Sequence, residues 1–203
     1  MADALIESIV SNRNTLAMMA AIKNKSNYLY EHAVNSGVLM EVFARHMKLN
    51  IDIIHDLVTG AMLHDIGMIE VPDEIVNNQE KLNAAEEKEV QRHIVIGRKI
   101  LEKTRGVPPI VFDVCNHHHE RLDGQGYMLK IHNHQINQYS RVAAIVDVYD
   151  ALTSDRSYRK AFFTCGGHEK ITGIGWCLIG CKTGLPVYSV YEYFSGGQPG
   201  ATG

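Results

Sequence analysis

The apolar residues in the N-terminal part of the chain recur at the spacing of amphipathic helices. Those between positions 54 and 62 fall at i, i+3, i+4, i+7 and i+8, on one helix face: Ile54, Leu57, Val58, Ala61 and Met62. Asp65 continues the same face. The pattern therefore predicts a helix whose buried side ends in a carboxylate.

Three further segments also have helical periodicity. One stripe lies on a single predicted helix that begins in the charged run 86–89 and ends before residue 106: Val90, His93, Gly97, Ile100 and Leu101. A second stripe has His32 one turn before it and Leu39 and Phe43 beside it: Val34, Val38 and Val42. The third segment, 141–152, has an apolar centre at 142–146, which predicts burial on every side.

Fold class and domain organisation follow from these patterns. Strand signals are poor before residue 162, so we expect an all-α fold, a helical bundle, with loops at 71–73 and 123–126. The composition then changes, because residues 163–203 hold most of the glycines, three of the four cysteines and few charges. We predict a domain at 1–162 and an atypical tail at 163–203, for which a truncated or out-of-frame reading is one explanation.

Polar residues at apolar positions are the chemical signal of this sequence. His93, Asp65 and Asp147 lie where helix periodicity expects aliphatic side chains, and burying an unpaired carboxylate costs several kcal/mol. The neighbouring candidates are histidines, which do not neutralise a carboxylate when uncharged but bind the same divalent cations. A metal site therefore explains both residue types.

The candidate ligands are too many for one ion. Seven nitrogen and oxygen ligands are available: His32, His64, Asp65, His93, His118, His119 and Asp147. Two ions bridged by a carboxylate fit this number. The absence of a thiolate from the set favours iron, manganese or similar ions over a structural zinc site.

Several motifs in order along the chain resemble the HD-GYP subgroup of the HD phosphohydrolase superfamily. They are HDIG at 64–67, His93 with Gly97, HHERLDGQGY at 118–127 and DVYDALTSDRSYRKA at 147–161, within a match from Ser26 to Ala161. The resemblance implies a helical bundle with a bi- or trinuclear iron or manganese centre. It also implies phosphodiesterase activity on cyclic di-GMP, giving linear pGpG and then GMP.

The resemblance also implies roles for individual residues. The family's metal ligands correspond to the seven residues named above, and His64, Asp65 and Asp147 form the catalytic set, with a hydroxide that bridges the metals as nucleophile. Arg156 and Arg159 are expected to bind substrate phosphates. Asp150 is expected to order a metal-bound water or a histidine, and Tyr127 to stack on a guanine.

The chain departs from the family pattern at three positions. Met68 replaces a lysine that helps to bind a substrate phosphate, and Met128 replaces the proline of the GYP motif. Tyr28 lies where members with three metals have an acidic residue, which favours two ions. The family's further helices are not evident after residue 162, and an upstream sensory domain or a signalling partner is expected.

Charge and cysteine content exclude several classes of protein. The net charge of −3 provides no basic surface for duplex nucleic acid. No apolar run is long enough for a membrane span, and the acidic N-terminus differs from a signal peptide, so we expect a cytoplasmic location. Four unevenly spaced cysteines do not form a disulfide framework.

Three functions from different classes fit the sequence. The first is a metal-dependent cyclic di-GMP phosphodiesterase. The second is a hydrolase of another cyclic dinucleotide, such as cyclic GMP-AMP. The third is a catalytically weak module that binds a nucleotide or a partner protein in signalling, which Met68 and the unusual tail favour and which the complete ligand set opposes.

Overall fold

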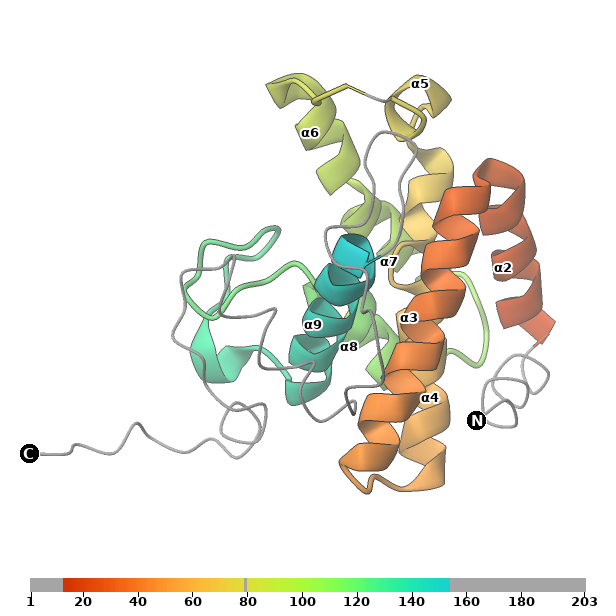
Figure 1. Cartoon of the computed structure of the whole chain (residues 1–203), viewed down its shortest axis with the longest axis vertical. Helices are drawn as coiled ribbons and strands as arrows, with labels where there is room; N and C mark the ends of the chain where they lie inside the picture. The colour runs from red at the N-terminus through yellow and green to blue at the C-terminus, as the bar shows by residue number, and fades with distance from the viewer. Residues whose placement is uncertain (1–12, 79, 154–203) are drawn as a thin grey trace, which may run out of the picture. The chain divides into compact units, whose positions relative to one another are not determined.

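The computed structural model describes residues 13–78 and 80–153, which form a helical bundle without any strand in these ranges (Figure 1). The expected all-α fold is confirmed. The helices are α2 (Arg13–Lys25), α3 (Asn27–His46), α4 (Ile51–Leu63), α5 (Asp73–Val76), α6 (Ala84–Gln91), α7 (His93–Glu102), α8 (Pro109–His117) and α9 (Gln138–Thr153), with 3-10 helices η1 (Ile66–Glu70) and η2 (Asn133–Gln135). The tail 163–203 lies outside the described residues.

Local signals explain where several helices begin. Asn50 caps α4 by accepting a hydrogen bond from the Asp52 backbone nitrogen. Asn83 and Glu86 form a reciprocal capping box at the start of α6. Pro109 occupies the first position of α8, where a missing N–H costs no helical hydrogen bond.

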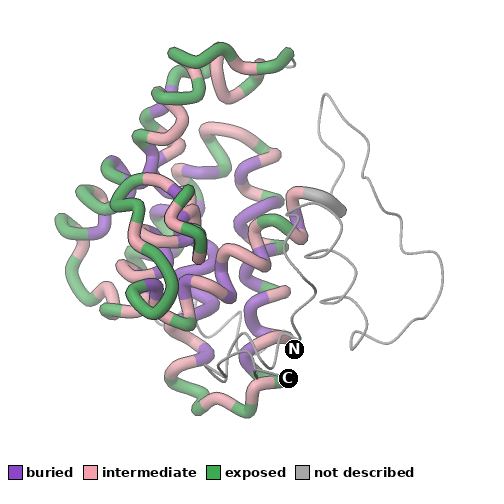
Figure 2. Tube along the Cα trace, turned by 90° about the vertical axis from the view of Figure 1, so that its left-hand side faces the viewer, coloured by how far each residue is buried: buried purple, intermediate pink, exposed green. Residues whose placement is uncertain are grey.

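The core lies between α3, α4, α8 and α9. Helix α4 packs against both α3 and α8, and α9 packs against α3 and α8, while α7 packs on η1. The predicted apolar face of α4 is confirmed, because all five of its residues are almost completely buried. Figure 2 shows the buried positions along the inward sides of the helices. In the described part of the chain, no helix has the length and apolar character to cross a bilayer.

The prediction for the buried face of α3 is wrong. Val38 is 39% exposed, whereas Leu29, Ala33, Met40 and Ala44 are buried. This face also holds His32 and Ser36, and its small residues leave room for close packing of α3 against α4. The hydrophobicity of the true inner face is low because two polar residues, His32 and Ser36, and two alanines, Ala33 and Ala44, occupy it.

Two other helix predictions need correction. The single helix expected from residue 86 to 101 is divided at Arg92, whose N–H donates to the Glu89 carbonyl, three residues back. A turn closed over three residues belongs to 3-10 geometry, which interrupts the α-helical ladder. In α9, Val142, Ala143 and Val146 are buried but Ala144 and Ile145 are half-buried, so the centre is not enclosed on every side.

Candidate metal centre

The described residues bring all seven predicted ligands together. His32 comes from α3, Asp147 from α9, and the others from helix ends: His64 after α4, Asp65 before η1, His93 at the start of α7, and His118 and His119 after α8. They form two groups, Asp65 with His93, His118 and His119, and His32 with His64 and Asp147. Within each group the ligand atoms lie within 4.8 Å of one another.

Backbone carbonyls fix the orientation of three imidazoles. His64 Nδ1 lies 2.7 Å from the Ala61 oxygen, and His93 Nδ1 lies 2.6 Å from the Val90 oxygen. His118 Nδ1 lies 3.1 Å from the carbonyl oxygens of residues 114 and 115. A carbonyl only accepts hydrogen bonds, so Nδ1 of each ring carries the proton. The Nε2 atom of each neutral ring then presents a lone pair to the interior.

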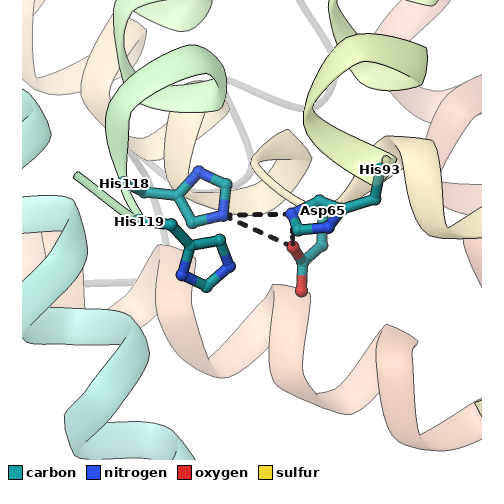
Figure 3. A group of neighbouring side chains, drawn as sticks. All are labelled: Asp65, His93, His118 and His119. Carbon is teal, nitrogen blue, oxygen red and sulfur yellow. Dashed lines mark hydrogen bonds and ion pairs between the residues drawn. The ribbon is translucent and has the colours of Figure 1, made fainter. Parts of the chain in front are cut away.

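These lone pairs face other acceptors. His93 Nε2 lies 3.2 Å and His118 Nε2 lies 3.5 Å from Asp65 Oδ1. Dashed lines mark both contacts in Figure 3. The Nε2 atoms of His32 and His64 are 3.2 Å apart, so a proton or a cation lies between them. Asp65 Oδ1 is buried and accepts no hydrogen bond of good geometry within the described residues. Converging acceptors repel one another unless a proton or a cation lies between them, so the donor set fits a divalent metal.

Both aspartates face the two groups at once. Asp65 directs Oδ1 to the first group, and its Oδ2 lies 3.5 Å from His64 Nε2 in the second. Asp147 Oδ1 lies 3.2 Å from His32 Nε2, and its Oδ2 lies 4.0 Å from His119 Nδ1. Each carboxylate therefore has one oxygen near each group.

Burial and mutual charge shift the titration of the cluster. Burial lowers the pKa of His64 to about 4 and the pKa of His119 well below its usual range, and neighbouring imidazoles add to both effects. Burial also lowers the pKa of His32, but the carboxylates of Asp147, Asp150 and Asp65 outweigh it and raise this pKa to about 10.

The aspartates respond in the opposite direction. Burial raises the pKa of Asp65 and of Asp147, but the surrounding histidines outweigh it and hold both pKa values well below their ordinary range. Both carboxylates are therefore ionised at neutral pH and available to a cation.

The residues predicted to contact substrate have different outcomes. Asp150 is buried, and its Oδ2 lies 2.6 Å from His32 Nδ1, so it orients a histidine, one of the two roles expected for it. The Tyr127 ring stacks on His119 with centroids 4.7 Å apart. Arg156 and Arg159 lie outside the described residues.

A cavity of about 380 Å³ opens beside the cluster. Five of the candidate ligands line one part of it, namely His32, Asp65, His93, His119 and Asp147. The rest of the lining is apolar or aromatic: Tyr28, Leu29, Met68, Val90, Tyr127, Val148 and Ala151. Four of these lining residues were not predicted from the sequence, although each lies within a turn of a candidate ligand: Leu29, Val90, Val148 and Ala151.

Comparisons with known proteins identify the family and several relatives of this chain. A family model described as HD domain matches residues 16–168. A cyclic di-GMP phosphodiesterase of Pseudomonas aeruginosa is 39% identical over 160 residues, which cover 79% of this chain and 39% of the relative. The 3′3′-cGAMP-specific phosphodiesterase 1 of Vibrio cholerae is 35% identical over 156 residues, covering 76% and 35%. The chain thus spans less than half the length of these curated relatives.

Proposed function

Because the chain belongs to the HD-domain family, we propose that it is a metal-dependent phosphodiesterase that hydrolyses cyclic di-GMP to linear pGpG, to GMP or to both. The observation that carries the proposal is the pair of carboxylates, Asp65 and Asp147, each facing histidines of both groups. We assign the activity to residues 1–162 and treat 163–203 as a separate tail.

The HD domain and the cluster of histidines and aspartates support binding of a divalent metal. We further propose two ions, iron or manganese, because seven nitrogen and oxygen ligands exceed the number that one ion usually takes from a protein. The proposed ligands are the seven residues of the two groups, among which Asp65 and Asp147 would face both ions. When bound, divalent ions polarise phosphoryl oxygens and supply a nucleophilic water near neutral pH.

The chain's own residues prepare this centre. Asp65 and Asp147 offset the positive charge of the ions, and Asp150 fixes the ring of His32 by accepting from its Nδ1. His32, Asp65, His93, His119 and Asp147 line the cavity, so a phosphodiester in the cavity lies against the proposed ligands. Arg156 and Arg159 remain our proposal for further phosphate contacts.

The experiment is anaerobic reconstitution with Fe(II) or Mn(II), followed by chromatography of the products from cyclic di-GMP. We expect pGpG or GMP, and we expect both to disappear on chelation. Asp65→Ala should lose bound metal and activity together. His46→Ala removes an exposed histidine outside the cluster and serves as the matched control. A folded, metal-loaded protein that releases no product would contradict the proposal.

A second substrate is favoured by one comparison. The Vibrio cholerae relative named 3′3′-cGAMP-specific phosphodiesterase 1 covers 76% of this chain. A hybrid cyclic dinucleotide is therefore our second candidate. Initial rates with the two substrates, offered separately and then in competition to the same metal-loaded preparation, decide between them. A higher kcat/KM for the hybrid cyclic dinucleotide than for cyclic di-GMP would make the hybrid the preferred substrate.

A further inference from the structure

His119 differs from the other four histidines of the cluster in what fixes its ring. His32 Nδ1 bonds to Asp150, and the Nδ1 atoms of His64, His93 and His118 bond to backbone carbonyls. Within the residues that the structure describes, neither ring nitrogen of His119 makes a hydrogen bond. A metal-ligating histidine is ordinarily oriented by a hydrogen bond from its second nitrogen, so another contact must orient this ring.

Aromatic packing holds His119 instead. Its ring is stacked on Tyr127 at a centroid distance of 4.7 Å and an interplanar angle of 28°. His118 lies at 4.1 Å with a tilt of 44°, and His93 meets the ring edge-on at 5.2 Å. His118 and His93 are themselves fixed by their Nδ1 bonds. Tyr127 is thus the one of these three rings that stacks on the imidazole.

Tyr127 is held by the backbone that follows His119. The buried carboxylate of Glu120 accepts the Leu129 N–H at 2.6 Å and the Lys130 N–H at 3.2 Å through Oε1, which ties down the loop just beyond the tyrosine. The Tyr127 N–H lies 3.4 Å from the His119 carbonyl oxygen. A Cβ at Gly126 would lie 2.6 Å from the His119 oxygen and from the Glu120 Cα, so glycine allows this close approach.

We propose that Tyr127 is a positioning residue for the metal ligand His119, and that Glu120 holds the loop that presents it. The inference rests on the proposed function, because it assigns His119 to the metal centre. The ring of Tyr127 replaces the hydrogen bond that the other four histidines have. Since one face of the tyrosine ring covers His119, that face is closed to a nucleobase.

The test compares two substitutions at Tyr127. Tyr127→Phe keeps the ring and Tyr127→Leu removes it, and the dissociation constant for Mn²⁺ is measured by competition with a chelator in the absence of nucleotide. We expect Tyr127→Leu to weaken binding about 10–100-fold, as for other contacts that orient a ligand, and Tyr127→Phe to stay within about twofold of the parent. Tyr30→Leu, the same change at a tyrosine that contacts Lys23 outside the cavity, is the matched control.

Three outcomes overturn the inference. The first is that Tyr127→Leu binds Mn²⁺ with an affinity within about twofold of the parent. The second is that Tyr127→Phe and Tyr127→Leu weaken Mn²⁺ binding equally. The third is that Tyr127→Leu raises KM for cyclic di-GMP while its Mn²⁺ affinity is unchanged. The last result would make Tyr127 a substrate contact. If Tyr127→Leu does not fold, Glu120→Ala tests the inference instead, because this variant frees the loop but keeps the tyrosine. Glu120→Ala should weaken Mn²⁺ binding, and Glu120→Gln, which keeps an accepting oxygen, should bind Mn²⁺ like the parent. Glu120→Ala with parental affinity also contradicts the proposal.

The metal readout separates this inference from the proposed function. Mn²⁺ affinity is measured without turnover, so the series remains interpretable if no cyclic dinucleotide is hydrolysed. If the variants show the expected order of Mn²⁺ affinities but no cyclic dinucleotide is hydrolysed, the proposed phosphodiesterase activity is refuted. The positioning role of Tyr127 is then still supported.

Discussion

Replacing Gly67 with alanine is expected to displace two candidate metal ligands, Asp65 and His93. Gly67 lies in η1, two residues after Asp65, where η1 passes against the first turn of α7. A Cβ there would lie 1.9 Å from the His93 carbonyl oxygen and 2.6 Å from the Gly97 nitrogen. Both obstacles are backbone atoms of α7, so no side-chain rotation relieves the overlap.

The size of the effect follows from these distances. To restore van der Waals contact, α7 and η1 must separate by about 1.5 Å, and His93 and Asp65 move apart with them. Overpacking of a rigid core costs about 1–3 kcal/mol, and we expect the upper end, about 3 kcal/mol, because backbone must shift. For a domain of this size that lowers Tm by about 6–12 °C.

Gly60→Ala provides the matched control. A Cβ at Gly60 lies 3.2 Å from the Val114 Cβ, a side-chain contact that yields by a few tenths of an ångström. Alanine also gains about 1 kcal/mol of helix propensity inside α4, which offsets the crowding.

The assay is thermal unfolding of both variants, with and without Mn²⁺, together with their Mn²⁺ dissociation constants. We expect Gly67→Ala to lose stability and at least tenfold in affinity, as for lost orienting contacts, and Gly60→Ala to resemble the parent. Equal stability and affinity in the two variants would refute the argument from close approach.

Three other perturbations have defined outcomes. Asp150→Ala removes the carboxylate oxygen that accepts from His32 Nδ1, so chelator competition should show a Mn²⁺ affinity about 10–100-fold lower; unchanged affinity would contradict its orienting role. Met68→Lys adds a cation to the cavity wall, so steady-state kinetics should show a lower KM for cyclic di-GMP; a higher KM would count against a phosphate near Met68. Burial raises the pKa of the Cys115 thiol to about 12, so the reactive thiolate is scarce at pH 8. Peptide mass spectrometry after iodoacetamide treatment should therefore find Cys115 unmodified in the folded protein. Alkylation as fast as in a urea-unfolded sample would contradict this expectation.

More of the candidate site than of the helix packing could be predicted from the sequence. Asp65 and His93 were detectable because carboxylate and imidazole interrupt otherwise apolar helix faces, and such interruptions need partners. The inner face of α3 was not detectable in the same way. His32 and Ser36 occupy that face beside Ala33, so a pattern search favours the more hydrophobic valines on another side.

Side-chain orientation lay beyond the sequence for a different reason. The carbonyl partners of His64 and His93 lie three residues earlier in each case, and this spacing is a signal that could have indicated the Nδ1 tautomer. The stacking of Tyr127 on His119 depends on a loop conformation set by Glu120, and no periodicity records it. The guanine contact expected for Tyr127 stays a prediction, and the structure shows the ring stacked on an imidazole.

The ends of α4 and α8 add an electrostatic contribution that belongs to no single ligand. His64 and His118 are the C-cap residues of these helices, so two C-terminal macrodipoles, each equivalent to roughly half a negative charge, meet the cluster. The N-terminal ends of α7 and of the five-residue η1 oppose them. This field comes from peptide groups and survives substitution of any one imidazole. Variants that lack a single histidine should therefore keep residual attraction for cations and lose metal in steps.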